Sequence, residues 1–236
     1  MIYLTTGLTS NGKTLELART AYKLAYRNLK WYKKTGRFRN IYHNFPINQE
    51  AIKEFVNSAG ESMFLRWYDI AEFLEMRECD ILWDEVAVDM DSSNWANVDP
   101  EVKNFLRHHA KRGIDIYGTT QRWGSVDLNY RSIVDEMFVA HKILGSARPS
   151  ATKPAVKHPW GIVWLDEQKQ ESFIKDKIES AGMLGWRLMF ITKDLCNLYD
   201  TKYEPKRSAW PPLRHQERFC PVPNCGYHQI GKISHI

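Results

Sequence analysis

A segment near the N-terminus has the residue types and the spacing of a phosphate-binding loop. It matches the Walker A pattern G-x-x-x-x-G-K-S/T at every fixed position, and it reads Gly7, Leu8, Thr9, Ser10, Asn11, Gly12, Lys13 and Thr14. Glycines let backbone N–H groups approach phosphate oxygens, and the N-terminus of a following helix favours negative charge. The pattern therefore predicts that Lys13 reaches the β- and γ-phosphates of a nucleoside triphosphate and that the Thr14 hydroxyl binds Mg²⁺.

A second group of chemically useful residues is a pair of adjacent carboxylates in an apolar run. Residues 80–87 have the pattern of a buried parallel strand that meets Asp84 and Glu85 at a polar edge. In a nucleotide-hydrolysing site Asp84 would hold Mg²⁺ through water, and Glu85 would be the base that polarises an attacking water. The alternative is an ordinary buried strand that ends in two surface acids. The adjacent acid favours an ATPase motor over a small-metabolite kinase or a GTPase switch, and the sequence has no guanine-reading N-K-x-D segment.

The elements that must position these groups alternate along the chain. Apolar spacing predicts helices over residues 14–32, 50–57, 67–75 and 100–111. β-favouring runs predict strands over residues 2–4, 40–47, 80–87, 113–120, 137–143, 161–165 and 188–191. Strands that alternate with helices favour right-handed βαβ units. We therefore expect an α/β fold over residues 1–200, with the mostly parallel sheet of a P-loop NTPase flanked by helices.

Composition excludes several other classes of protein. The chain has 236 residues, of which 43% are hydrophobic and 26% are charged, so wholesale disorder is excluded. No apolar run approaches the ~18 residues of a membrane span, and the N-terminus lacks the pattern of a signal peptide. Cys79 and Cys196 stand alone in apolar surroundings and are expected to be buried thiols. These features predict a soluble protein of a reducing compartment.

Basic residues cluster in two parts of the chain, residues 19–39 and the tail at residues 201–236. Residues 19–39 contain eight Lys or Arg residues and no acid, although the formal net charge of the whole chain is only +5. Two basic patches on a nearly neutral body suggest a polyanion that is contacted at defined places. Helical spacing puts four of these side chains on one face, where they could bind DNA phosphates: Lys23, Arg27, Lys30 and Lys34. An ordinary solvated helix face is the alternative, and the loop at residues 146–158 offers Arg148, Lys153 and Lys157 as further DNA contacts.

The end of the chain, residues 201–236, differs in character from the rest. It is a basic, proline-rich tail in which four side chains have metal-ligand chemistry: Cys220, Cys225, His228 and His235. These could build a small tetrahedral Zn²⁺ site, and zinc would then fold a tail that has little apolar material. An unstructured terminus with two free thiols is the other interpretation.

The segment at residues 105–126 resembles part of the FtsK/HerA-type DNA-translocating ATPases. In that family a basic helix leads through Gly-Ile into a strand that ends Thr-Gln-Arg, and here these are Gly113-Ile114 and Thr120-Gln121-Arg122. The resemblance implies that this strand lies next to the carboxylate strand and that Gln121 senses the γ-phosphate. It also suggests candidates for an arginine that reaches a neighbouring subunit's nucleotide, namely Arg131, Arg107 and Arg112.

The order of motifs along the chain is also similar to that of the zonula-occludens-toxin-like ATPases of filamentous and related phages. The shared order comprises the phosphate loop, His43-Asn44 followed by Pro46, the Trp-Asp-Glu strand, the Thr-Gln-Arg strand and a late stretch at residues 198–201. The filamentous-phage proteins usually continue into a membrane span, which this chain lacks. It therefore looks more like a soluble viral genome-packaging ATPase.

These resemblances imply an oligomeric ATPase of the additional-strand, catalytic-glutamate type that moves DNA into a viral capsid. The implied partners are ATP, DNA, a capsid or vertex protein and further copies of the chain in a ring, with Mg²⁺ as cofactor. The expected location is the host cytoplasm or the virion. Two alternatives remain: a phage assembly or secretion ATPase that moves protein, and a nucleic-acid-binding structural protein with a vestigial ATP site.

Overall fold

One mixed sheet forms the centre of the molecule. The computed structural model describes residues 1–8, 11–48, 55, 62–93, 95–142, 160–165, 183–189, 192, 195, 198 and 199. Their strands are β1 (Ile2–Thr6), β2 (Ile41–His43), β3 (Phe64–Arg66), β4 (Asp80–Trp83), β5 (Asp115–Thr120), β6 (Glu136–Lys142), β7 (Trp160–Leu165) and β8 (Met183–Met189). They lie in the order β3-β2-β4-β5-β1-β6-β7-β8. The strands from β3 to β6 pair in parallel, and β7 and β8 add antiparallel pairs at one edge.

The order of the parallel strands identifies the kind of sheet. β5 lies between β1, which leads into the phosphate loop, and β4, which leads into the two carboxylates. This inserted strand is the additional strand that the sequence analysis expected. The register pairs Thr6 of β1 with Thr120 of β5, so the two strands end level with each other. The mostly parallel α/β fold of a P-loop NTPase is therefore confirmed.

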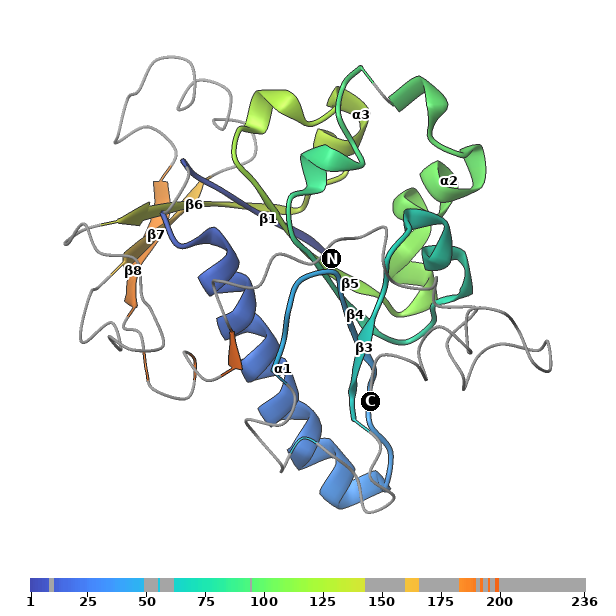
Figure 1. Ribbon diagram of the computed structural model, residues 1–236, viewed down its shortest axis with the longest axis vertical. Helices are drawn as coiled ribbons and strands as arrows, with labels where there is room; N and C mark the ends of the chain where they lie inside the picture. Colours follow the sequence, from blue (N-terminus) through green and yellow to red (C-terminus); the bar gives the residue numbers. More distant parts are fainter. Residues whose placement is uncertain are drawn as a thin grey trace, which may run out of the picture.

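Helices cover both faces of the sheet. They are α1 (Lys13–Thr35), α2 (Pro100–His108) and α3 (Leu128–Arg131), with 3₁₀ helices η3 (Ile70–Glu75), η4 (Val86–Val88), η5 (Trp95–Asn97), η6 (His109–Arg112) and η7 (Trp123–Ser125). Figure 1 shows α1 on one side of the sheet and α2 and α3 on the other. Alternation along β4 serves both layers: Leu82 packs in the core beneath α1, whereas Ile81 and Trp83 pack with the α2 side.

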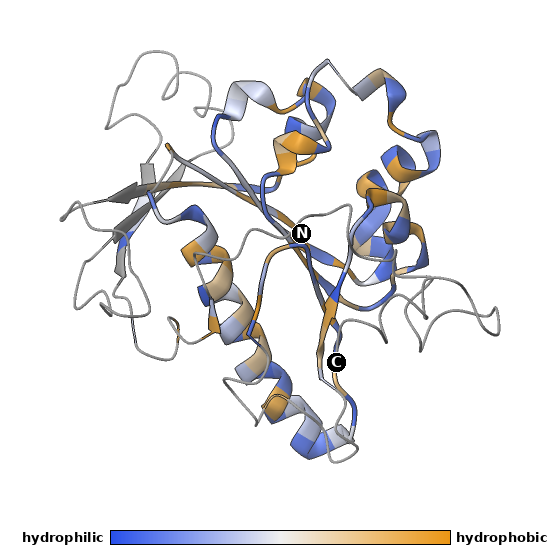
Figure 2. Cartoon of the chain, viewed as in Figure 1, coloured by the Kyte–Doolittle hydropathy of each residue, from blue (hydrophilic) through white to orange (hydrophobic). Residues whose placement is uncertain are grey.

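Helix α1 forms where its sequence pattern predicts. Small and branched apolar residues at three- and four-residue steps, among them Leu17, Ala21 and Leu24, are buried against the sheet. The helix ends at Gly36, which has a φ of 69° and donates its N–H to the carbonyl of Tyr32, so the predicted stop is confirmed. Hydrophilic residues dominate the C-terminal turns of α1 in Figure 2.

Several predicted elements differ from those in the structure. The helix expected over residues 67–75 is the 3₁₀ helix η3, and Asp69 caps it with a side-chain bond to the N–H of Ala71. The expected strands over residues 40–47 and 80–87 are shorter, because β2 stops at His43 and β4 stops at Trp83. Strand β3 was not predicted, since three residues carry too little periodicity to detect.

The other predictions are confirmed or lie outside the described residues. The expected helix over residues 100–111 is divided into α2 and η6, and Asp99 caps α2 as predicted by accepting from the N–H of Glu101. The last predicted strand, residues 188–191, corresponds to β8, which begins earlier at Met183. Cys79 is a buried free thiol as expected. The predicted helix at 50–57, apart from Phe55, the loop at 146–159, Cys196 and the tail from 201 are not described by the structure.

Buried His43 makes stability depend on pH. Its Nδ1 lies 2.7 Å from the carbonyl oxygen of Phe45, and burial lowers its pKa from 6.5 to about 4. Between these values only the unfolded chain takes up the proton, so the free energy of unfolding should rise with pH by up to about 1.4 kcal/mol per unit. In denaturant titrations from pH 4.5 to 6.5 we expect His43→Gln to show a shallower rise than the wild type. Equal slopes in the two proteins would exclude His43 as the source.

Candidate active site

Four chemically active segments meet at one edge of the sheet because their strands are parallel neighbours. The phosphate loop follows β1, Asp84 follows β4, Gln121 follows β5 and Asn44 follows β2. Adjacent parallel strands end at the same edge, which is where α/β proteins with open sheets bind ligands. The sequence-predicted loop, carboxylates and glutamine are therefore brought together, although they lie up to 114 residues apart in the chain.

The loop backbone has the conformation that its glycines permit. Gly12 has a φ of 89°, in the left-handed region, and its carbonyl accepts the first helical hydrogen bond of α1 from Glu16 at 2.8 Å. Gly7 has a φ of 150°, and a Cβ there would lie only 2.6 Å from the carbonyl oxygen of Ala140 in β6. Both glycines are thus required by geometry. Thr9 and Ser10 lie outside the described residues.

Lys13 is held inside this loop. Its side chain is buried, and its Nζ donates to the carbonyl of Leu8 at 3.3 Å. Burial lowers the pKa of the Lys13 ammonium, while the nearby carboxylates of Glu85 and Asp84 act in the opposite direction. A cation on the inner side of a phosphate loop is the arrangement that binds triphosphate oxygens.

Thr14 and Asp84 meet across the intervening strand. The Thr14 hydroxyl lies 3.2 Å from Oδ1 and 3.3 Å from Oδ2 of Asp84. A second hydroxyl, from Thr119 at the end of β5, donates to Asp84 Oδ1 at 2.6 Å. Hydroxyl and carboxylate oxygens are the hard ligands that Mg²⁺ prefers, and phosphates and waters ordinarily complete its shell. The residues present therefore fit the predicted Mg²⁺ site, although no cluster of three or more His, Cys, Asp or Glu occurs among the residues described.

Glu85 lies beside this pair in an unusual conformation. It is one of two non-glycine residues with positive φ in the described part of the chain, with φ 56° and ψ 60°. Its Oε1 accepts from Nε2 of the exposed Gln121 at 3.3 Å, and its backbone N–H donates to the hydroxyl of Thr119 at 3.0 Å. Burial and then the charge of Asp84 raise the pKa of the Glu85 carboxyl, whereas Lys13 and Gln121 lower it. A carboxylate with a raised pKa is better suited to accept a proton from water.

Two polar residues of the site had no predicted role. Asn44 is buried at the end of β2, where its Nδ2 donates to the Asp84 carbonyl at 3.0 Å and its Oδ1 accepts from the Asp84 N–H at 2.7 Å. Thr119 is fully buried and bonds to both Asp84 and Glu85. His43-Asn44 is one of the motifs in the order shared with the zonula-occludens-toxin-like ATPases, but that similarity implied no role for Asn44. Only its position directly after a short buried strand could have suggested a structural role.

The candidate trans-acting arginines are placed differently from one another. Arg112 precedes β5 and therefore lies at the other end of that strand from Gln121. Its guanidinium donates to the Leu74 carbonyl at 3.0 Å and lies 5.0 Å from the centre of the Phe105 ring. Arg107 is exposed on α2. Arg131 lies on the side of the carboxyl edge, 5.6 Å over the Trp123 ring. The role of each in a neighbouring subunit's site stays a prediction.

A hollow of about 620 Å³ lies beside the loop. Gly7, Leu8, Gln121 and Trp123 are among the residues that line it. The hollow connects the phosphate loop with the segment from Gln121 to Ser125. It is therefore the space in which a ligand on the loop could meet groups from β5 and η7.

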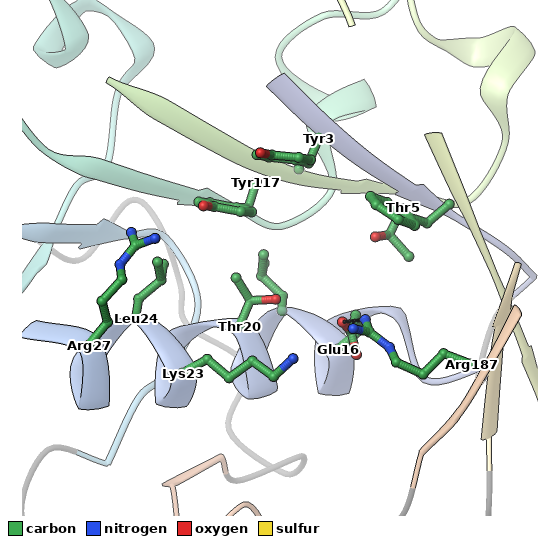
Figure 3. A pocket seen from close by; sticks show the side chains of 12 residues that line it. Tyr3, Thr5, Glu16, Thr20, Lys23, Leu24, Arg27, Tyr117 and Arg187 are labelled. Carbon is green, nitrogen blue, oxygen red and sulfur yellow. Dashed lines mark hydrogen bonds and ion pairs between the residues drawn. The ribbon is translucent and has the colours of Figure 1, made fainter. Parts of the chain in front are cut away.

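The basic stripe on α1 is divided between two environments. Lys23 and Arg27 line a cavity of about 290 Å³ between α1 and the sheet, where Figure 3 shows them below the stacked rings of Tyr3 and Tyr117. Arg27 also lies 3.7 Å from the carboxylate of Asp80. Two other members of the stripe, Lys30 and Lys34, are exposed at the far end of the helix beside Trp31, which is 57% exposed. Lys23 and Arg27 are exposed as well, and 62% of the Arg27 side chain is exposed, so the whole stripe is open to a large polyanion.

The remaining predicted contacts fall outside the described residues. They are the DNA-binding candidates Arg148, Lys153 and Lys157 and the zinc candidates Cys220, Cys225, His228 and His235. Both assignments stay predictions. Across the described ranges, none of the helices has the length and hydropathy needed to cross a membrane.

Comparison with known proteins shows what the fold is similar to. No protein-family model and no curated protein matches the sequence. The N-terminal domain of zonular occludens toxin from Neisseria meningitidis aligns with a TM-score of 0.51 at 16% identity, over 84% of this chain and 98% of that chain. The genome packaging NTPase B204 from Sulfolobus turreted icosahedral virus 2, in complex with ATP-gammaS, aligns with a TM-score of 0.43 at 13% identity, over 72% and 93%. The DNA-packaging ATPase B204 from Sulfolobus turreted icosahedral virus has a TM-score of 0.41 at 11% identity, over 72% and 93%.

These similarities concern architecture. The chain has the P-loop NTPase fold, with the additional strand between the loop strand and the carboxylate strand. Within that class its fold is similar to the N-terminal domain of zonular occludens toxin, as the order of motifs in the sequence predicted. What the site does must be argued from its own residues.

The left-handed backbone of Glu85 should cost stability. An L-residue in this region costs about 1–2 kcal/mol, and glycine relieves that cost but adds about 0.5–1 kcal/mol of chain entropy. We therefore expect Glu85→Gly to raise the free energy of unfolding by about 0.5–1 kcal/mol. Glu78 is the matched control, because it has φ 45°, is exposed and lies at the other end of the sheet. Glu78→Gly should stabilise similarly, and destabilisation by both changes would refute the strain at these positions.

Proposed function

We propose that the chain binds ATP with Mg²⁺ and hydrolyses it. One observation carries the proposal: the Thr14 hydroxyl contacts the Asp84 carboxylate, 3.2–3.3 Å from its two oxygens. The preceding residue in the chain is the buried Lys13, which brings an ammonium group to the same site. The loop offers backbone N–H groups and a cation to phosphates, and the strand opposite offers a carboxylate to a metal. Binding and hydrolysis thus have separate residues at one edge of the sheet.

Each residue has a distinct part in the proposed reaction. Lys13 neutralises the charge of the β- and γ-phosphates, and Thr14 and Asp84 would hold Mg²⁺. Bound Mg²⁺ would supply further stabilisation of the negative charge that develops on the transferred phosphoryl group. Glu85 accepts a proton from the attacking water, and its bond to Gln121 keeps the carboxylate on the side of the hollow.

We propose further that hydrolysis drives the movement of DNA, as in a viral genome-packaging motor. The exposed end of α1 supports this, because Lys30, Lys34 and the solvent-exposed Trp31 together offer phosphate contacts and a surface for base stacking. A ring of several copies would bring an arginine, for which Arg131 is a candidate, to a neighbour's nucleotide. A capsid or vertex protein would then be the partner that receives the DNA.

Glu85 and Lys13 should have separable effects on catalysis and binding. Glu85→Gln removes the proton acceptor but keeps the shape of the side chain, so turnover should fall by at least about 100-fold while nucleotide affinity is retained. Lys13→Ala should lose nucleotide binding itself. Phosphate release and titration with a fluorescent ATP analogue measure the two quantities, with Glu78→Gln as the control for a change of one exposed charge. Normal turnover in Glu85→Gln would remove Glu85 from the mechanism.

DNA should stimulate the ATPase in a salt-dependent manner. Each phosphate contact that is lost reduces the steepness of log DNA affinity against log salt by about one. Lys30→Ala combined with Lys34→Ala should therefore reduce that steepness by about two. The double variant should also weaken the stimulation by DNA and leave basal turnover unchanged. The matched control replaces Lys103 and Lys111, which lie on the α2 side. Assays with single- and double-stranded DNA over a salt series test this. Stimulation by coat protein alone would indicate a motor that moves protein, and DNA binding without stimulation would indicate a structural protein.

A further inference from the structure

The two catalytic carboxylates are held by polar side chains from the strands on either side of β4. Asn44 comes from the end of β2, and Thr119 comes from β5, so Asp84 is hydrogen-bonded from both neighbouring strands and Glu85 from β5. Both side chains are buried, at 5% and 0% exposure. Buried polar groups of this kind are costly unless they are bonded, so a polar residue at both positions needs a specific reason.

Asn44 fixes the peptide backbone of Asp84. Its side-chain amide makes two hydrogen bonds to the same residue, one to the Asp84 N–H at 2.7 Å and one from Nδ2 to the Asp84 carbonyl at 3.0 Å. These groups continue the pairing of β2 with β4 beyond His43 and Leu82, where the backbone ladder ends. The amide therefore acts as an extra rung of the sheet at the residue that would hold the metal.

Thr119 connects both carboxylate residues through one hydroxyl. The hydroxyl donates its proton to Asp84 Oδ1 at 2.6 Å and accepts the backbone N–H of Glu85 at 3.0 Å. The first bond orients the Asp84 carboxylate toward Thr14, and the second holds the backbone of Glu85, which has a φ of 56°. A left-handed conformation at a glutamate persists only when its surroundings enforce it.

The geometry points to Asn44 and Thr119 as positioning residues for hydrolysis, which together hold Asp84 on the metal side and Glu85 in its left-handed conformation. This assignment rests on the proposed function. Among the residues that the structure describes, neither side chain forms a hydrogen bond with the phosphate loop. Their loss should therefore affect catalysis and the contribution of Mg²⁺ to binding, and should leave the binding of metal-free nucleotide intact.

Thr119→Val is the sharpest test, because valine keeps the shape of threonine and removes the hydroxyl. Outer residues that orient a metal site are worth about 10–100-fold in metal affinity or activity, so kcat should fall by about that factor. Titration calorimetry with a non-hydrolysable ATP analogue should show unchanged affinity without Mg²⁺ and a smaller gain on adding Mg²⁺. Thr119→Ser should restore both quantities, since it keeps the hydroxyl.

The neighbouring residue supplies a matched control. Thr120 is also fully buried in β5, but its hydroxyl donates to the Arg122 carbonyl at 3.3 Å and not to a carboxylate. Thr120→Val should leave kcat and the Mg²⁺-dependent gain in affinity within about 2-fold of wild type, because it makes the same chemical change without touching the carboxylate pair. Equal effects of the two valine substitutions would overturn the assignment of Thr119.

Asn44 gives an independent test should Thr119→Val fail to fold. Asn44→Ala removes both bonds to Asp84, and Asn44→Asp keeps an acceptor for the Asp84 N–H, so kcat should fall more in the alanine variant. Wild-type kcat in a folded Asn44→Ala variant would overturn the assignment of Asn44. A wild-type chain that binds or hydrolyses no nucleotide would instead overturn the proposed function and this assignment together.

Discussion

The contact between Thr14 and Asp84 has to span an intervening strand. Neighbouring strands lie about 4.8 Å apart, so the ends of β1 and β4 are separated by about 10 Å, with β5 between them. The loop after β1 crosses this distance before α1 begins, which places Thr14 above the end of β5 and within 3.3 Å of Asp84. The phosphate loop, the additional strand and the first turn of α1 must therefore keep one fixed arrangement.

Packing on the two faces of the sheet maintains that arrangement. On one face, apolar residues of α1 pack on Leu82 and its neighbours, and on the other face Trp83 packs edge to face against Trp67 and Phe73. Close-packed cores of this kind transmit small displacements, because they hold few voids that could absorb them. The site itself is polar and strained, so its geometry depends on the apolar layers beneath it.

Several groups of the site are energetically unfavourable in the folded state, and the packing of the core must compensate for them. Lys13 is buried, Glu85 has a left-handed backbone, and burial and then the charge of the adjacent Asp84 raise the pKa of the Glu85 carboxyl. Bonds from Asn44, Thr119 and Gln121 satisfy Asp84 and Glu85 without neutralising them, and the Leu8 carbonyl accepts from the Lys13 ammonium. A site of this kind holds charge ready for a ligand, because its groups are oriented before the ligand arrives.

The sequence by itself determined the local features of this protein. Glycine spacing specified the phosphate loop from Gly7 to Thr14, and apolar periodicity specified α1, because both signals lie within a few turns of chain. Only the tertiary structure decided where β4 stops, that Thr119 and Asn44 bond to the carboxylate residues, and that Lys23 and Arg27 line the cavity beside the sheet, whose lining does not include Lys30 and Lys34. The physical reason is that these outcomes depend on strand order and register, which bring together groups such as Asn44 and Thr119, 75 residues apart, that no local pattern connects.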